Sequence, residues 1–271
     1  ALAATNLADH CCQYMFEGCT SLTNAPALPA VTLADSCYFS MFKDCTALAQ
    51  APDLPATNLA TYCCYEMFAG CTALTNAPVL PAETLAGHCY YKMFTGCTSL
   101  AQTPLLASTN LASHCYANMF EGCTGLTRLP ELPATTLDYG CYNAMFKSCT
   151  GITLCADGTA PTWGIPDDAQ EKAGWNTDML LGTGGSFTGN PVIGALYYYT
   201  PSTPPVSTAY LTFSSTNTFK VTPQVASWDG TLEYSTDAAD WHELTTTGAD
   251  AALGGFGDYR LHIRGTNNTC V

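Results

Sequence analysis

The stretch Cys89–Leu100, "CYYKMFTGCTSL", decides the fold because the chain repeats it. It returns as "CYFSMFKDCTAL" from Cys37 and as "CYANMFEGCTGL" from Cys115. A fixed period of this kind indicates structural repeats that stack and are stable only together. The methionines of the motif lie 26 residues apart, at Met15, Met41, Met67, Met93, Met119 and Met145.

Apolar residues within each repeat recur at a spacing of four. In one repeat these are Leu85, Cys89 and Met93, a spacing typical of one helix face. Thr84 precedes the leucine and suits a helix N-cap. The other half of the repeat, "ALTNAPVLPA" in residues 73–82, is rich in proline and suits one short extended strand. We therefore predict an α/β solenoid of six 26-residue strand-helix coils.

The composition argues against nucleic acid and membranes as binding partners. The formal net charge is −14, and such a surface repels nucleic acid, which proteins bind through Lys and Arg. Hydrophobic residues make up 47% of the chain, which is ample for a folded core. No apolar run approaches the roughly 18 residues of a membrane span, so we expect no direct membrane insertion. The first residues, "ALAATNLADHC", lie inside a repeat and show no signal peptide, so we expect a trimmed part of a longer protein.

The motif "MFEGCTSLTNAPALPA", followed by "LADSCY", resembles the BspA-like family of leucine-rich repeats in bacterial surface proteins. The resemblance covers residues 1–155. It implies a curved solenoid on a secreted or cell-surface protein, with a role in adhesion or ligand binding. The chain departs from the common family pattern in its second cysteine per repeat and in its proline-rich strands.

Sixteen cysteines allow four interpretations: disulfides, a zinc site, a nucleophile, or buried packing. Most lie at two repeat positions in register with Leu, Met and Phe, which favours a buried thiol ladder with occasional bridges between rungs. Cys155 and Cys270 lie outside it and are candidates for a disulfide. We expect no metal and no cofactor. The ladder comprises Cys11, Cys19, Cys37, Cys45, Cys63, Cys71, Cys89, Cys97, Cys115, Cys123, Cys141 and Cys149.

Positions that vary between repeats are the candidates for binding. Exposed aromatic rings could anchor a protein or stack on sugars, or they could lean on each other and seal the surface. The aromatic candidates are His10, Tyr14, Phe39, Tyr62, Tyr65, His88, Tyr91, His114 and Tyr139. A second series could form a polar groove, or an amide ladder that stabilises stacked strands. Its members are Asn24, Gln50, Asn76 and Gln102.

The repeat stops near residue 156. "PDDAQEKAGW", Pro166–Trp175, predicts one short helix within a capping segment of residues 156–194. Short β runs then predict a small antiparallel β-sandwich-like domain over residues 195–271. Among these runs, "LEYSTDAADWHEL" and "LHIRG" resemble β-modules that accompany BspA-like repeats in gut-bacterial surface proteins.

No motif of a hydrolase, zinc protease or nucleotide-binding loop occurs in the chain. We expect a non-enzymatic adhesion protein at the cell surface or outside the cell, which recognises a host protein or glycan through the repeats. One alternative is a structural spacer with no ligand of its own. Another is an accessory part of a carbohydrate-active surface protein.

Overall fold

The fold was analysed in a computed structural model, which describes residues 4–157 and 162–199 together with the strands that follow. The chain divides into two compact units, Ala1–Thr200 and Pro201–Val271. Each unit is described by itself.

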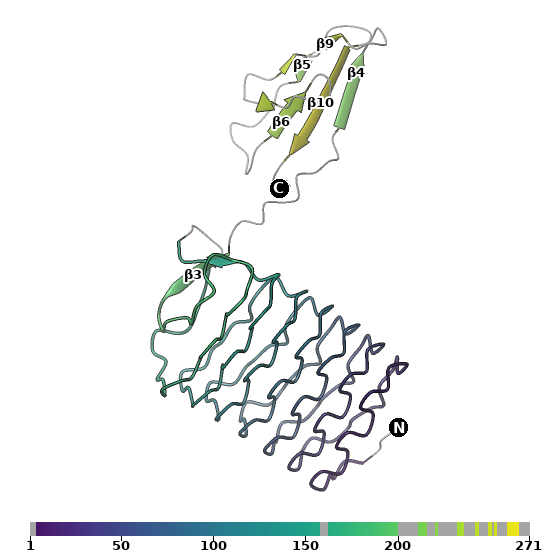
Figure 1. The fold of residues 1–271 in the computed structure, drawn as a ribbon, viewed down its shortest axis with the longest axis vertical. Helices are drawn as coiled ribbons and strands as arrows, with labels where there is room; N and C mark the ends of the chain where they lie inside the picture. The colour runs from purple at the N-terminus through teal and green to yellow at the C-terminus, as the bar shows by residue number, and fades with distance from the viewer. Residues whose placement is uncertain are drawn as a thin grey trace. The chain divides into compact units, whose positions relative to one another are not determined.

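The first unit is a stack of coils (Figure 1). Parallel bridges join residues 26 apart in neighbouring coils, such as Asn24 with Gln50 and Thr32 with Asn58. The prediction of an α/β solenoid made of strand-helix coils is wrong. No α-helix occurs in the described residues, and the extended parts of neighbouring coils meet through single bridges.

The segment predicted to be a helix is a ribbon of overlapping four-residue turns, which we call the turn ribbon. Its backbone amides alternate between two kinds of acceptor. The Tyr65 N–H donates within the coil to Tyr62 O at 3.2 Å, and the next amide, Glu66 N–H, donates to Tyr91 O of the following coil at 2.9 Å. The same alternation continues with Met67 and Phe68. Half of these amides therefore join the coils together.

Backbone conformation explains why no helix forms. Every fourth residue has a positive φ, as at Tyr62 (57°), Glu66 (51°) and Gly70 (74°), and a left-handed residue cannot continue an α-helix. A spacing of four also overshoots the helical repeat by about 40° at each step. The four-residue period that suggested a helix is thus the period of the turns.

The other half of each coil is an extended leg that carries the prolines. Thr84 is not an N-cap, because it bridges to Asn58 on one side and Asn110 on the other. Pro78 and Pro81 have no amide to donate, so the middle of the leg cannot form a continuous ladder. Single bridges at the ends of the leg are the result.

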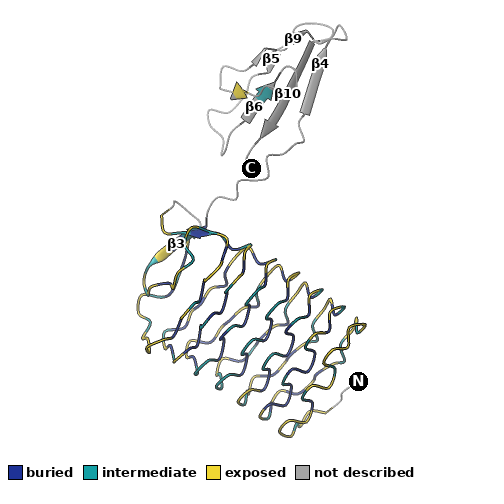
Figure 2. Ribbon diagram, in the orientation of Figure 1, coloured by how far each residue is buried: buried dark blue, intermediate teal, exposed yellow. Residues whose placement is uncertain are grey.

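The core lies between the turn ribbon and the extended leg (Figure 2). Met67, Phe68 and Cys71 are fully buried, and Leu80 covers them from the extended leg with 5% of its surface exposed. The phenylalanines stack from coil to coil, with ring centroids 5.6 Å apart for Phe42 and Phe68. Each coil therefore completes the core of its neighbours.

A seventh coil, which the sequence analysis missed, closes the stack. Thr136 bridges in parallel to Gln170, and the Phe146 N–H donates to Met179 O at 3.0 Å. Met179 and Leu180 continue the Met-Phe columns and are fully buried. The helix predicted over Pro166–Trp175 is wrong, because this segment forms a turn, a bridge and the first turns of the seventh coil.

A three-stranded antiparallel sheet lies beside the end of the stack. It comprises β1 (Leu154–Cys155), β2 (Thr162–Gly164) and β3 (Leu196–Tyr199), in the order β1-β3-β2. The sequence analysis assigned β3 to the C-terminal domain, whereas its partners and its compact unit place it with the stack.

The second unit contains antiparallel strands. The strands β4, β10, β6 and β7 pair in that order, β9 also pairs with β10, and β5 pairs with β8. Tyr234 and His242 are the two residues of this unit whose side chains are described, so the predicted sandwich-like packing lies outside the described residues. The bounds are β4 Leu211–Ser215, β5 Lys220–Val221, β6 Leu232–Ser235, β7 His242–Glu243, β8 Ala249–Asp250, β9 Ala252–Leu253 and β10 Tyr259–Gly265.

Candidate functional site

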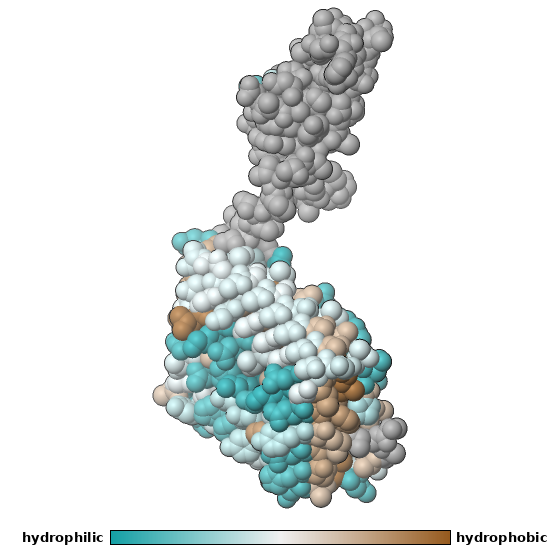
Figure 3. Space-filling model, turned by 45° about the vertical axis from the view of Figure 1, so that its right-hand side comes forward, coloured by the Kyte–Doolittle hydropathy of each residue, from teal (hydrophilic) through white to brown (hydrophobic). Residues whose placement is uncertain are grey.

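The turn ribbon sets side chains in columns that run along the stack. Because neighbouring coils are hydrogen-bonded in register, residues 26 apart become neighbours. Side chains of similar hydropathy accordingly form parallel rows across successive coils in the space-filling view (Figure 3). A repeated aromatic residue in the sequence thus becomes a continuous surface feature.

Two aromatic columns lie side by side on the turn ribbon, and we call them together the aromatic ladder. The first column contains Phe39, Tyr65 and Tyr91, and the second contains Tyr62, His88, His114 and Tyr139. Contacts such as that of Tyr62 with Tyr65, at 5.8 Å between centroids, join the columns. Tyr14 extends the ladder through an edge contact with Phe39 at 5.4 Å. The structure therefore brings together every aromatic candidate except His10, which bonds to Gln13.

Most neighbouring rings within a column stack face to face, whereas Tyr139 meets His114 edge-on at 5.2 Å. Tyr65 lies 4.4 Å from Phe39 and 4.7 Å from Tyr91, with interplanar angles of 7° and 9°. His88 lies 4.7 Å from both Tyr62 and His114. Neighbouring rings therefore cover most ring faces, and the partly exposed ladder offers ring edges and polar ring atoms to a partner.

Burial favours the uncharged forms of two ladder residues, His88 and Tyr65, by shifting their pKa values. Desolvation lowers the pKa of His88 below its ordinary value, and the neighbouring His114 lowers it further. Desolvation, together with nearby Glu66, raises the pKa of Tyr65 to about 12. The Tyr65 hydroxyl thus remains a neutral hydrogen-bond donor at ordinary pH.

The amide series lies on the extended leg rather than beside the aromatic ladder. Asn24, Gln50, Asn76 and Gln102 are exposed and joined by parallel backbone bridges. The Gln50 side chain donates to Thr75 Oγ1 at 3.2 Å, and the Asn76 side chain donates to the same oxygen. Within the described residues, no hydrogen bond joins two of these amides, so threonine hydroxyls take the place of an amide ladder.

The thiols of one column donate hydrogen bonds. The Cys97 Sγ lies 3.2 Å from Phe68 O, and the Cys123 Sγ lies 3.0 Å from Phe94 O. Burial raises the pKa of Cys71 to about 12, so this thiol stays protonated and can donate. The same contact recurs at Cys45, Cys71 and Cys149. From Cys45 to Cys149, cysteine at this position is therefore a packing residue and also a donor to an inner carbonyl. In the first coil Cys11 and Cys19 are exposed, so the prediction that they are buried is wrong.

The fifteen described cysteines are free, while Cys270 lies outside the described residues, as does its predicted pairing with Cys155. The Cys155 Sγ donates to Asp157 O at 3.0 Å. Among the described residues, no group of three or more His, Cys, Asp or Glu side chains is placed to hold a metal ion.

A pocket that sequence reasoning missed lies at the end of the stack. It is lined by the sixth extended leg, by β2 with the residues that follow it, and by the chain at the start of β3. No local motif marks it, because its walls come from segments that lie far apart in the sequence.

No protein-family model, curated protein or solved structure matches the chain. In the described part, no helix is long and apolar enough to cross a membrane. The resemblance to BspA-like repeats therefore stays a prediction.

Proposed function

We propose that the chain is a non-enzymatic adhesion protein of the cell surface, which binds a protein partner through the aromatic ladder. The observation that carries this proposal is the alignment of seven partly exposed rings in two adjacent columns. Tyrosine is enriched at the centres of protein interfaces because it combines a large apolar ring with a hydrogen-bonding group. The BspA-like resemblance independently implies adhesion.

The stacking favours a protein partner over a glycan. A sugar ring binds on the exposed face of an aromatic ring, whereas Tyr65 is stacked on both sides by Phe39 and Tyr91. Edges and hydroxyl groups remain available, and these suit the side chains and backbone of a protein. Buried thiols with a raised pKa are poor nucleophiles, which also favours binding over catalysis.

The same stacking supports a second candidate, a structural spacer. Rings that contact each other from coil to coil also seal the turn ribbon and stiffen the stack. A spacer depends on the stacking of the rings and not on their hydroxyl groups. Removing the hydroxyl groups should therefore weaken a binding protein but leave a spacer unchanged.

The test is binding of the full chain to an array of secreted and surface proteins, beside a glycan array. We expect saturable binding to a protein and none to glycans. The double variant Tyr65→Phe with Tyr91→Phe keeps the stacked rings but loses two hydroxyl groups, so we expect its affinity to fall by about tenfold or more.

The control is Tyr198→Phe, which removes a partly buried hydroxyl group from β3, outside the ladder. Its affinity should equal that of the unmodified chain. Glycan binding, or equal affinity of the double variant, would contradict the proposed site. A chain that binds no protein while keeping its fold would favour the spacer.

A further inference from the structure

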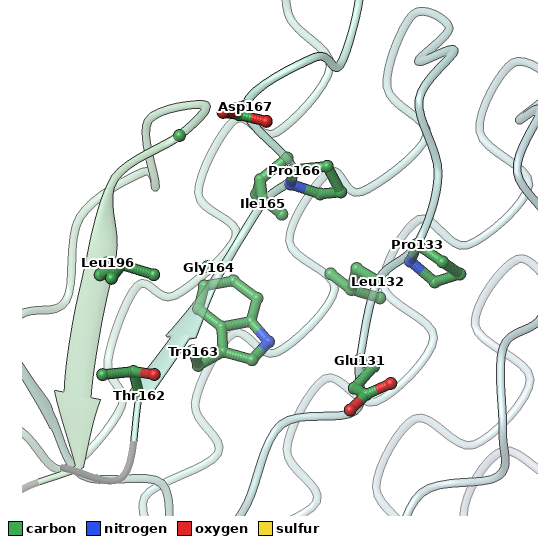
Figure 4. A pocket seen from close by; sticks show the side chains of 11 residues that line it. Glu131, Leu132, Pro133, Thr162, Trp163, Gly164, Ile165, Pro166, Asp167 and Leu196 are labelled. Atoms are coloured by element: carbon green, nitrogen blue, oxygen red, sulfur yellow. The ribbon is translucent and has the colours of Figure 1, made fainter.

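The pocket at the end of the stack has a volume of about 520 Å³ (Figure 4). We call it the end pocket. Three segments form its walls: the sixth extended leg, the chain from β2 to Asp167, and the chain from Gly194 to Leu196. The lining residues that decide its chemistry are Glu131, Leu132, Trp163, Ile165, Asp167 and Leu196.

The end pocket is apolar at its base. Leu132 and Ile165 are each 3% exposed, and Trp163 is 6% exposed. The Trp163 Nε1–H donates to Pro130 O at 2.9 Å, so the indole contributes apolar surface alone to the pocket. This base suits aliphatic side chains.

The charges of the end pocket are all negative. Glu131 and Asp167 are exposed carboxylates, and no Lys or Arg is among its lining residues. Nearby Arg128 is held over the Tyr199 ring at 4.3 Å and does not line the pocket. Since the chain carries a net charge of −14, the pocket favours a cationic ligand.

An exposed apolar row leads along the extended legs to the end pocket. Val79 and Leu105 occupy the position of Glu131 in the two preceding coils, and they are 75% and 69% exposed. Leu196, on the far wall of the pocket, is 57% exposed. Coils repeat at about 4.8 Å, so the row and the pocket form one elongated surface. Val79 and Leu105 together therefore offer an apolar contact surface next to the end pocket.

We propose that the row and the end pocket bind an extended segment of another protein, in which aliphatic residues are flanked by lysine or arginine. The aliphatic residues pack on Val79, Leu105 and the base of the pocket. The basic residues pair with Glu131 and Asp167. β2 is the edge strand of its sheet, and an extended segment can add to such an edge. This surface is separate from the aromatic ladder.

The probes are synthetic peptides of about nine residues, which span roughly 30 Å when extended. One set has leucine and valine flanked by lysine, and a matched set has glutamate in place of lysine. Binding to the full chain is measured by fluorescence anisotropy at low and high salt. We expect the lysine set to bind, the glutamate set not to bind, and added salt to weaken binding.

Two variants locate the site. Glu131→Gln with Asp167→Asn should lower the affinity for the lysine peptides by about tenfold, and so should Leu105→Asp. The matched control is Glu83→Gln, which removes an exposed carboxylate of the fourth extended leg outside the end pocket.

Several outcomes would overturn the proposal: no peptide binding, equal binding of both sets, or unchanged affinity in the two variants. Binding of a glycan or a small amine at the pocket, without peptide binding, would overturn it too. Tyr65→Phe with Tyr91→Phe should leave peptide binding unchanged. The proposal for the end pocket and the proposal for the aromatic ladder can therefore fail independently of each other.

Discussion

At the scale of the residue, Gly96 shows that certain positions of the turn ribbon require a left-handed backbone conformation. Its φ is +74°, and an added Cβ would meet Gly70 only at ordinary contact distances of 3.8 and 3.9 Å. We expect Gly96→Ala to lower the free energy of unfolding by about 1–2 kcal/mol, because a left-handed conformation is unfavourable for alanine. Urea unfolding measures this change.

Gly87 provides the matched control. It lacks the positive φ of Gly96, and an added Cβ would contact Ser113 O at 3.7 Å. Gly87→Ala should therefore be neutral or raise the free energy of unfolding by about 0.4–1 kcal/mol. Equal destabilisation by the two substitutions would rule out the conformational explanation.

The two cysteine columns differ in the hydrogen bonds that their thiol groups make. The Cys97 Sγ donates to Phe68 O at 3.2 Å, whereas thiols in the column of Cys115 make longer contacts, such as 3.9 Å from the Cys63 Sγ to Cys89 O. We expect Cys97→Ser to be more stable than Cys97→Ala by about 0.5–1 kcal/mol, because serine can still donate. At Cys115, serine should be no better than alanine. The same preference for serine at both positions, in thermal unfolding, would argue against the thiol hydrogen bond.

At the scale of the element, the stacked His88 makes the turn ribbon sensitive to acid. The pKa of His88 is lowered in the folded chain, so the unfolded chain binds the proton more readily. Its stabilising contribution is present above about pH 6.5 and is lost as the pH falls through the folded pKa. The groups around it are Tyr62, Tyr91 and His114, and Ser113 bonds to His114 Nδ1.

The measurement is urea unfolding of the chain and of His88→Phe between about pH 7.5 and pH 5. Phenylalanine keeps a stacked ring but cannot take up a proton. The unmodified chain should lose more stability over this range than the variant. An identical loss in both would show that the histidine stack is not the cause.

The sequence predicted which residues share a column but not the backbone that joins them. Met67, Phe68 and Cys71 are buried in register, as the 26-residue period implies. The same apolar spacing fits both a helix face and a series of turns, and the hydrogen bonds between coils decide between them. Tyr62 and Glu66 give no local sign of a positive φ, because such conformations usually favour glycine.

The aromatic candidates of the site were predictable because a column follows from the period alone. The end pocket was not, because it depends on where β2 meets the sixth extended leg. The seventh coil left a weak signal in Met179, which follows Met145 after 34 residues instead of 26. A segment containing β1 and β2 accounts for the longer interval.

At the scale of the whole first unit, the seventh coil holds the end of the stack closed. The amides of Tyr142, Ala144 and Phe146 donate to its carbonyls at 2.8–3.0 Å. Leu180 is fully buried at the end of the phenylalanine column, so Leu180→Asp would place an unpaired charge there. We expect this substitution to open the seventh coil and to lower the free energy of unfolding by about 3–5 kcal/mol.

Hydrogen exchange distinguishes this local opening from general destabilisation. Because each coil contacts mainly its neighbours, the amides of Tyr142 and Phe146 should exchange much faster in Leu180→Asp, whereas those of Tyr38 and Phe42 should change least. Leu181→Asp is the matched control, since Leu181 is 45% exposed while its carbonyl still accepts from Ser148. It should leave all four amides protected. Equal loss of protection along the whole stack would mean that the coils unfold as one unit and that the seventh coil is no separate closure.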